Sequence, residues 1–435
     1  MPKARRPAVA FVTLGCPKNE VDSDRMAASL GGSFELVSRI ENADAVVVNT
    51  CSFIRDATEE SVAIVLELAE GWKTEGEGRL LVVAGCMPSR YGDELAVAMP
   101  EVDAFVPVPD EANLLRVLVS LTGTAADGEG GAGRLAPGPS AYLQVADGCH
   151  LKCTYCTIPS IRGPYLSRPL PELLDEARLL VAGGARELVL IGQDISSWGR
   201  DLPGAESLAD LVREIAHVEG LAWLRLMYVQ PDAITPELLE VMSEEPAVCR
   251  YLDMPLQHAS RDVLRAMGRR GDGAEYLRLI STVRGFMPDI FLRTSVIAGF
   301  PGETRKDAAR LQEFLRDARL DYVGVFVYSP EDGTPAAAMP DQVPARTRRA
   351  RAQRLRDVCD EVGFEKAAEL VGRVLEVLVE GVDEDGEPLG RHRGQAPEVD
   401  GVVLLGRELP AGEIVEVEIA DALGYDLVAR VRDVS

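Results

Sequence analysis

The stretch "ADGCHLKCTYC", residues 146–156, carries three cysteines, Cys149, Cys153 and Cys156, separated by three residues and then by two. It includes the end of the apolar run "YLQVA", which predicts a strand. Structural zinc sites normally use four ligands, whereas a 4Fe–4S cluster held by three thiolates keeps one iron open for a small molecule. The spacing therefore indicates an open iron–sulfur cluster. The alternatives are a zinc ion with His150 as a fourth ligand, and chance spacing.

Five further strand-like runs follow this stretch and alternate with helical patterns: "ELVLIG", "WLRLMYV", "RYLDMPL", "LRTSVIAGF" and "YVGVFVYS". Together with the first strand they make six units, two fewer than a full eight-unit barrel. We therefore expect an open, partial (β/α)6 barrel over residues 141–362. Its ligand should lie at the carboxyl ends of the strands.

Upstream, residues 1–122 show the same alternation and predict a parallel, doubly wound α/β sheet. Three of its strands run directly into a cysteine, in "VTLGC", "VVVNTC" and "VVAGC". Cys16, Cys51 and Cys86 are one βα unit apart each time. Since parallel strands end at one edge of a sheet, the three thiols should converge there. The alternative for any single one is a small core cysteine.

Two further segments complete the chain. Residues 123–140 are rich in Gly, Ala and Pro and predict a linker. After the Arg-rich stretch "ARTRRARAQRLRDV", residues 363–435 alternate with period two, which predicts a small antiparallel β-barrel. From Val371 to Ser435 there are 15 acidic residues and 6 arginines, a net charge of −9.

The whole chain has a net charge of −24, which argues against non-specific nucleic-acid binding. Eight cysteines in 435 residues are too few for a disulfide scaffold and favour metal binding or chemistry in a reducing compartment. No apolar run approaches the roughly 18 residues of a membrane span. We expect a cytoplasmic monomer that does not bind membranes.

The cysteine spacing after the first barrel strand resembles the radical S-adenosylmethionine superfamily. In that superfamily the open iron chelates the cofactor, and an electron from the cluster cleaves it to a 5′-deoxyadenosyl radical. The aromatic residue before the third cysteine, the end of the second strand and the segment "SVIAGFPGE" then imply cofactor contacts. The residues concerned are Tyr155, Gln193, Asp194, Arg293, Ile297, Gly299 and Glu303.

Two three-cysteine sets followed by a TRAM-like barrel look like the radical S-adenosylmethionine methylthiotransferases. This resemblance covers nearly the whole chain and implies two 4Fe–4S clusters, one on Cys149, Cys153 and Cys156 and one on Cys16, Cys51 and Cys86. It also implies S-adenosylmethionine as cofactor and a reductant such as flavodoxin or ferredoxin. No general acid or base can be named, because radical hydrogen abstraction needs none at that step.

Within this family the chain is most similar to the RimO branch, which modifies the β-carbon of an aspartate in ribosomal protein uS12. "TLGCPKNEVDSDRM", "IPSIRGPYLSRP" and "DMPLQHAS" carry the similarity, together with Glu331, where the tRNA-modifying branch usually has Arg. Gln230 in "MYVQPD" departs from the expected aromatic residue. An acidic barrel suits a basic ribosomal protein better than tRNA, although the Arg-rich stretch could touch ribosomal RNA.

The rival hypotheses are a tRNA adenosine methylthiotransferase and an iron–sulfur carrier or scaffold. The first would favour a basic C-terminal barrel, and the second would not need the "SVIAGFPGE" segment. We expect Cys249 and Cys359 to be core residues, and His217, His258 and His392 to be structural or solvated.

Overall fold

The computed structural model describes residues 5–108, 113–124, 138–204 and 206–431, and it divides into two compact units. The first consists of Met1–Leu135, Asp147–His150 and Cys156–Leu166, and the second of Ala136–Ala146, Leu151–Tyr155 and Ser167–Ser435. The chain passes between them around β7 (Ala146–Asp147) and β8 (Leu166–Ser167). Most of the predicted linker, residues 125–137, lies outside the described residues.

The first unit is the expected parallel α/β sheet, with strand order β2-β1-β3-β4-β5. Its strands are β1 (Ala8–Thr13), β2 (Glu35–Leu36), β3 (Ala45–Thr50), β4 (Leu80–Gly85) and β5 (Ala104–Pro107). All six residues of β3 are buried, as a central parallel strand covered on both faces requires. The two-residue strand β2 is an addition that the sequence pattern did not predict.

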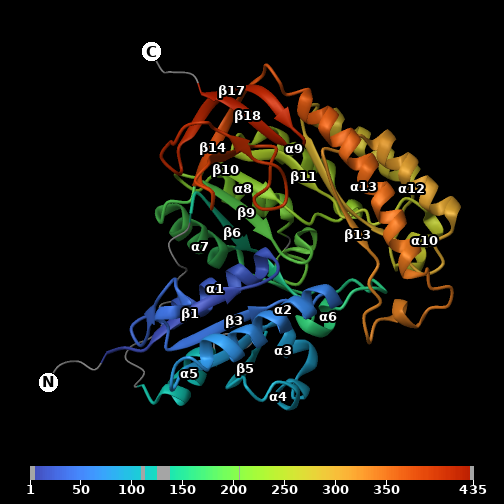
Figure 1. Ribbon diagram of the computed structural model, residues 1–435. Coiled ribbons are helices and arrows are strands. Elements are labelled where there is room, and N and C mark those ends of the chain that lie inside the picture. The colour runs from blue at the N-terminus through green and yellow to red at the C-terminus, as the bar shows by residue number, and fades with distance from the viewer. Residues whose placement is uncertain (1–4, 109–112, 125–137, 205, 432–435) are drawn as a thin grey trace. The chain divides into compact units, whose positions relative to one another are not determined.

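Helices cover both faces of this sheet (Figure 1). They are α1 (Pro17–Ser29), α2 (Arg55–Leu68), α3 (Cys86–Tyr91), α4 (Glu94–Ala98), α5 (Leu114–Thr122) and α6 (Ile158–Ile161), with short turns η1 (Ile40–Asn42) and η2 (Ala69–Lys73). Because side chains alternate along a strand, Val46 and Val48 pack toward α2, whereas Val47 packs toward α1 and α5. The sheet is therefore doubly wound, as predicted.

The second unit contains six parallel strands in the order β13-β12-β11-β10-β9-β6, with neighbours in sequence paired side by side. They are β6 (Ser140–Gln144), β9 (Glu187–Ile191), β10 (Trp223–Leu226), β11 (Val248–Asp253), β12 (Phe291–Ala298) and β13 (Tyr322–Val327). Since β6 and β13 are both edges, this sheet is open. The prediction of a partial six-unit barrel is confirmed.

Helices connect these strands (Figure 1). They are α7 (Leu170–Ala182), α8 (Leu208–Ala216), α9 (Pro236–Glu244), α10 (Arg261–Ala266), α11 (Gly273–Phe286), α12 (Arg305–Ala318) and α13 (Ala345–Ala368), with η4 (Ile195–Ser197), η5 (Pro231–Ala233) and η6 (Pro335–Ala338). Helix α12 begins with a reciprocal cap between Thr304 and Asp307. Helix α13 runs without a break through residue 362, where the sequence predicts a domain boundary.

The C-terminal strands close into a barrel, β14-β15-β16-β18-β17, in the same unit. They are β14 (Val374–Val382), β15 (Pro388–His392), β16 (Val403–Leu404), β17 (Ile414–Leu423) and β18 (Asp426–Val431). Four of the five pairings are antiparallel, as expected, but β16 and β18 pair in parallel. The short strands β15 and β16 have no clear period-two pattern, so the sequence did not reveal them.

Candidate functional site

Cys16, Cys51 and Cys86 lie at the carboxyl edge of the first unit's sheet. Their strands β1, β3 and β4 are neighbours, and Thr50 at the end of β3 pairs with Gly85 at the end of β4. Cys51 and Cys86 therefore follow two aligned residues, and Cys16 follows the adjacent strand after a short turn. The structure thus brings the three cysteines to one edge. We call it the three-cysteine edge.

The backbone at this edge is crowded. A Cβ atom on Gly15 would lie 2.5 Å from the Cβ of Cys51, and Gly15 adopts φ +101°, so only glycine fits this turn. The amide of Asn19 donates to the carbonyl oxygens of Leu14 (2.8 Å) and Thr50 (3.0 Å). Asn19 therefore holds together the residues that precede Cys16 and Cys51.

The thiols at this edge influence one another. Burial raises the pKa of Cys86 to about 12, with the charge of Arg162 acting in the opposite direction and Cys51 and Cys16 adding to the rise. Burial likewise raises the pKa of Cys51, and Cys16 adds to the effect. All eight cysteines of the chain are free thiols. The raised pKa values favour the protonated thiols of Cys51 and Cys86 until a metal binds and displaces their protons.

The thiols do not converge on a single point. Within the described ranges, no group of three or more Cys, His, Asp or Glu side chains is arranged to hold one metal ion. At the three-cysteine edge, the described residues thus form no ready site for a single ion such as zinc. Each cysteine of an iron–sulfur cluster binds a different iron, so cluster ligands surround the cofactor instead of meeting at one ion. The donor set fits a cluster.

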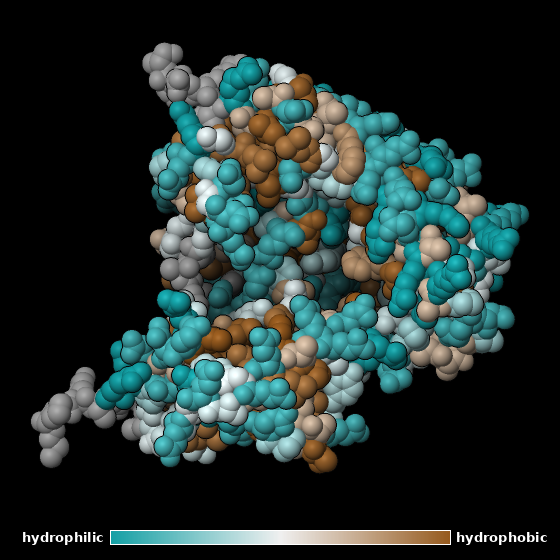
Figure 2. Space-filling view, in the orientation of Figure 1, coloured by the Kyte–Doolittle hydropathy of each residue, from teal (hydrophilic) through white to brown (hydrophobic). Residues whose placement is uncertain are grey.

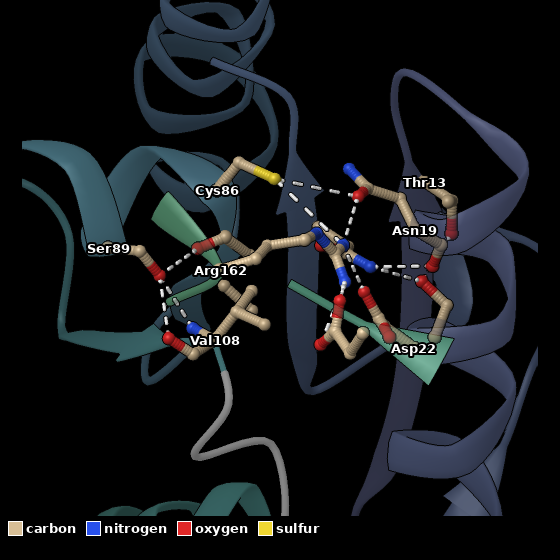
Figure 3. Close-up of polar contacts among 12 residues, drawn as sticks. Thr13, Asn19, Asp22, Cys86, Ser89, Val108 and Arg162 are labelled. Atoms are coloured by element: carbon tan, nitrogen blue, oxygen red, sulfur yellow. Dashed lines mark hydrogen bonds and ion pairs between the residues drawn. The ribbon is translucent and has the colours of Figure 1, made fainter. Parts of the chain in front are cut away.

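Arg162 is buried at the three-cysteine edge, with its side chain only 1% exposed (Figure 3). Its Nη2 donates to Asp22 Oδ2 (2.5 Å) and Asn19 Oδ1 (3.0 Å) and lies 4.0 Å from Cys86 Sγ. Its Nη1 reaches Asp147 Oδ1 at 3.3 Å. Burial alone would lower the pKa of Arg162, but the two carboxylates outweigh it, so the guanidinium remains charged.

The cysteine motif of residues 149–156 is divided between the two units, and each part is anchored within its own. In the first unit, Cys149 N donates to Gly163 O (3.3 Å). In the second, the backbone N of Thr154 donates to Met267 O (3.0 Å), and Arg269 Nη1 lies 3.9 Å from Cys153 Sγ. A cation therefore lies beside a predicted ligand sulfur here as well.

At the end of β9, Gln193 and Asp194 differ in their environment. Both amide atoms of Gln193 are buried and have no hydrogen-bond partner among the described residues. Asp194, in contrast, accepts hydrogen bonds from Ser196 N (3.0 Å) and Ser197 Oγ (2.7 Å) and caps η4. An unsatisfied buried amide costs free energy unless a ligand supplies partners. Gln193 therefore fits a polar cofactor, whereas Asp194 is already satisfied.

At the end of β12, Glu303 organises the predicted cofactor segment. Its Oε2 accepts from Gly299 N (2.6 Å), and its Oε1 pairs with Arg351 Nη1 (2.7 Å). Ile297 N donates to Gln257 O (2.8 Å), which joins the segment to the Gln257-His258 pair. Glu303 is therefore engaged inside the protein and fixes the shape of this strand end.

His258 is fully buried beside Glu303. Its Nδ1 accepts hydrogen bonds from Ala259 N and Ser260 N, both at 2.9 Å, so the proton of the neutral ring lies on Nε2. That nitrogen lies 3.6 Å from Glu303 Oε2. His258 is therefore anchored through Nδ1, and its structural role stays a prediction.

Tyr155 packs edge-on against Phe300, with ring centroids 6.4 Å apart, and Phe300 packs against Tyr328. Tyr155 thus lies where β12 and β13 end, and its contact with the adenine stays a prediction. Arg293 lies elsewhere, since its guanidinium pairs with Asp253 (3.2 Å) and with Asp400 of the C-terminal barrel (3.4 Å). The structure gives Arg293 an ion-pair role, and its cofactor contact stays a prediction.

The remaining residues that the sequence analysis names differ in their burial. Cys249 and Cys359 are buried, as expected for core cysteines. His392 is buried, and His217 is exposed and lies 3.3 Å from Glu245. In the Arg-rich stretch, Arg348 and Arg356 donate to backbone carbonyls of the barrel. The other face of α13 presents exposed arginines within the hydrophilic surface over α12 and α13 (Figure 2); they are Arg346, Arg349 and Arg354.

Sequence reasoning missed three features of these sites. Arg162 and Arg269 lie beside cysteines. The quoted stretch "IPSIRGPYLSRP" contains Arg162, but the sequence does not show that this arginine is buried beside a sulfur atom. Tyr228 and Gln257, after β10 and β11, adopt φ values of +64° and +69°. Such backbone strain in non-glycine residues often marks a functional site. It cannot be predicted from composition, although both residues lie in stretches that the sequence analysis quotes, "MYVQPD" and "DMPLQHAS".

Three family models match the chain in succession. They are the uncharacterized protein family UPF0004 over residues 8–107, the radical SAM superfamily over residues 143–315 and the TRAM domain over residues 371–431. The relative in Geobacter sulfurreducens, "Ribosomal protein uS12 methylthiotransferase RimO", is 44% identical over 97% of this chain and 98% of its own length. The chain belongs to the RimO family. A relative of the same name in Syntrophus aciditrophicus is also 44% identical, over 98% and 99% of the two chains.

Membership in the radical SAM superfamily implies a 4Fe–4S cluster and S-adenosylmethionine. A solved structure of the radical S-adenosylmethionine methyltransferase TsrM from Kitasatospora setae is similar, with a TM-score of 0.56 and 16% identity over 86% of this chain and 81% of that one. At this identity the similarity supports the fold alone. No described helix is long and apolar enough to cross a membrane.

Proposed function

We propose that this chain is a methylthiotransferase that replaces a hydrogen on the β-carbon of an aspartate in ribosomal protein uS12 with a methylthio group. The observation that carries the proposal is full-length identity of about 44% to relatives that bear this name. The radical SAM and TRAM matches agree with it. Glu331 and the Gln257-His258 pair favour this branch over the tRNA branch.

The chain holds two cofactor clusters in this proposal. Cys149, Cys153 and Cys156 bind the one that works with S-adenosylmethionine, and the three-cysteine edge binds the second. Three ligands at each leave one iron open, which suits binding of the cofactor at one site and of exchangeable sulfur at the other. When bound, S-adenosylmethionine would supply the radical and the methyl group, and the second cluster would supply the sulfur of the methylthio group. Support for the second cluster comes from the shared edge and the coupled thiols.

The cofactor contacts follow from how each residue is bonded. Gln193 is the direct polar contact, because its amide is buried without a partner in the described structure. Tyr155, Ile297 and Gly299 are the further cofactor contacts in this proposal. Asp194, Arg293 and Glu303 act as supports, because their charged groups already bond within the protein.

Two tasks remain for the chain's own residues. The ends of β9 and β12 must orient the cofactor rigidly. The hydrogen bonds that Ser196 N donates to Asp194 and that Gly299 N donates to Glu303 provide that rigidity. The protein must also exclude water and other hydrogen donors from the reacting carbon. No proton transfer to a protein base is required.

The C-terminal barrel is the docking surface for uS12 in this proposal. Its described acidic residues are largely exposed, whereas Arg391 is buried, so the surface is strongly acidic. Charge complementarity with a basic ribosomal protein would speed encounter and fix orientation. We further propose that the enzyme is a monomer and that a flavodoxin or ferredoxin supplies electrons.

The decisive experiment compares cells that lack this gene with cells in which it is restored. Mass spectrometry of uS12 should show a methylthio group on one aspartate only when the gene is present. If uS12 stays unmodified and methylthio-adenosine in tRNA follows the gene instead, the tRNA activity is correct. If neither modification follows the gene, the chain is an iron–sulfur carrier or scaffold.

Iron analysis tests the second cluster. Changing Cys149, Cys153 and Cys156 together to Ala should remove half of the iron of the reconstituted protein, and so should changing Cys16, Cys51 and Cys86. Changing Cys249 and Cys359 to Ala is the matched control, which should leave iron content intact. Full iron loss in the first variant would show that the three-cysteine edge binds no cluster by itself.

A further inference from the structure

Arg162 contacts residues of two helices at the three-cysteine edge, Asn19 and Asp22 of α1 and Cys86 at the start of α3. Asn19, one of its partners, also holds the carbonyls before Cys16 and Cys51, and Cys86 Sγ lies 3.7 Å from Asn19 Oδ1. Arg162 itself lies 4.0 Å from that sulfur. Figure 3 shows the guanidinium between Cys86, Asn19 and Asp22. Arg162 thus lies close to the sulfur of Cys86. It also bonds to Asn19, which holds the backbone before the other two cysteines of the edge.

The same guanidinium also holds the segments that flank the other cysteine motif. Asp147, bonded to Arg162 Nη1, lies two residues before Cys149. Arg162 lies six residues after Cys156, at the end of α6. Both flanking segments belong to the first unit. Displacing Arg162 would therefore disturb the surroundings of both cysteine sets.

The positive charge of Arg162 should also affect the reduction potential of a cluster bound at this edge. A thiolate-bound cluster carries negative charge, and reduction adds more, so a buried cation nearby favours the reduced form. Arg162 and its partner Asp22 are both buried, with side-chain exposures of 1% and 5%, so water screens them little. Asp22 offsets part of the positive charge. The two residues should therefore move the potential of a bound cluster in opposite directions.

We propose that Arg162 is a positioning residue that sets the reduction potential of the cluster at the three-cysteine edge. The negative charge of Asp22 offsets part of the effect of Arg162 on this potential. Resting on the proposed second cluster, this inference assigns Arg162 a function that its ion pair alone does not require. A residue that only stabilised the fold would lower thermal stability without a directed shift in potential.

The test isolates the second cluster. In full-length protein with Cys149, Cys153 and Cys156 changed to Ala, the remaining cluster is reconstituted and its midpoint potential is titrated by electron paramagnetic resonance. Arg162→Gln should lower the potential, by about tenfold in the reduction equilibrium, or about 59 mV for one electron. Asp22→Asn should raise it, and Arg162→Lys should stay near the parent value.

Ser89→Ala is the matched structural control. Ser89 Oγ bonds to Val108 and to Gly85 O and so anchors the helix that begins with Cys86, but it carries no charge (Figure 3). This variant should lower the melting temperature and leave the potential unchanged.

The outcomes separate the two proposals. If the triple-Ala parent binds no cluster, the proposed second cluster fails. If it does, and Arg162→Gln and Asp22→Asn shift the potential in the same direction or not at all, the assignment to Arg162 is wrong. Should Arg162→Gln fail to hold a cluster, Asp22→Asn decides alone: a rise supports the assignment, and no change or a fall overturns it.

Discussion

Glu187 Oε2 and Arg391 Nη2 form an ion pair at 2.6 Å, although 204 residues separate them in the chain. Glu187 begins strand β9 of the barrel, and Arg391 lies on β15 of the C-terminal domain. The other carboxylate oxygen pairs with Arg225 at 2.7 Å, and both partners are fully buried. One carboxylate therefore fastens the C-terminal domain to the amino ends of the barrel strands.

Breaking this network should be strongly destabilising. Arg391→Met leaves Glu187 with one partner fewer in a buried site, and we expect a loss of about 3–5 kcal/mol in the free energy of unfolding. Urea denaturation measures this loss. Arg319→Gln is the control, because its pairs with Glu365 and Glu369 are solvent-exposed and should contribute less than about 1 kcal/mol. Equal losses in the two variants would contradict the role of burial.

The same carboxylate should make stability depend on pH. Burial by itself would raise the pKa of Glu187, but Arg225 and Arg391 outweigh it and lower the pKa from 4.5 to about 2. The unfolded chain therefore takes up a proton first as the pH falls. The advantage of the parent over Glu187→Gln, about 3 kcal/mol, should be complete above pH 4.5 and disappear toward pH 2. Melting curves of both proteins across this range measure it.

His392 acts at higher pH. Burial, together with the charges of Arg225 and Arg391, lowers the pKa of His392 from 6.5 to about 3. The folded protein keeps the ring neutral while the unfolded chain binds a proton, so this contribution is complete above pH 6.5 and is lost as the pH falls. We expect about 1.4 kcal/mol per pH unit between pH 6 and 4. His392→Gln should flatten this part of the stability curve, and an unchanged slope would refute the assignment.

The sequence could reveal the fold because the repeated apolar runs are local signals. Strand β3, "AVVVNT", and the barrel strands each carry their own pattern, and a cysteine at a strand end must lie at the sheet edge. Charged residues have no such signal, since Arg and Glu are usually exposed. Arg162 and the Glu187–Arg391 pair become buried only because distant segments supply partners, which the local sequence does not encode.

For the candidate site, the sequence likewise indicated which segments to consider but not how their side chains are bonded. The family resemblance predicts Gln193 and Asp194 as cofactor contacts, but only the structure shows that their environments differ. Ser196 and Ser197 satisfy Asp194, and no described group satisfies Gln193. Likewise, the segment ending in Glu303 was recognisable, whereas the bond of its carboxylate to Arg351, 48 residues later, was not.

Gly148 should be essential for presenting Cys149. It adopts φ +66°, and a Cβ atom there would lie 2.1 Å from Pro164 O. Gly123 has the same φ with open space around it, so Gly123→Ala should cost only the backbone strain, about 1–2 kcal/mol. Gly148→Ala should cost more, since the backbone of the 163–164 segment must move as well. Its iron content after reconstitution should also fall, and iron content equal to that of Gly123→Ala would contradict the prediction.

The acidic C-terminal barrel should govern encounter with uS12. The loop between β14 and β15 carries exposed Glu384, Asp385 and Glu387, and Asp383 holds its shape by accepting hydrogen bonds from the backbone N–H groups of residues 385 and 387. Changing the first three to Lys while keeping Asp383 reverses the charge and preserves the loop. With purified uS12 as substrate, we expect KM to rise several-fold at low salt, with kcat unchanged.

Measurements at high salt and on a control variant distinguish a loss of electrostatic attraction from a structural defect. Because the Debye length shrinks to about 3 Å at 1 M salt, the difference in KM should disappear there. Changing Glu67, Glu75 and Glu77 to Lys makes the same change of charge at exposed positions of the first unit, which contains no part of the C-terminal barrel, and should change KM much less. If this first-unit variant raises KM as much as the loop variant, net charge governs binding and the C-terminal barrel is not the docking surface. If only the loop variant responds, and only at low salt, uS12 docks on this barrel by charge.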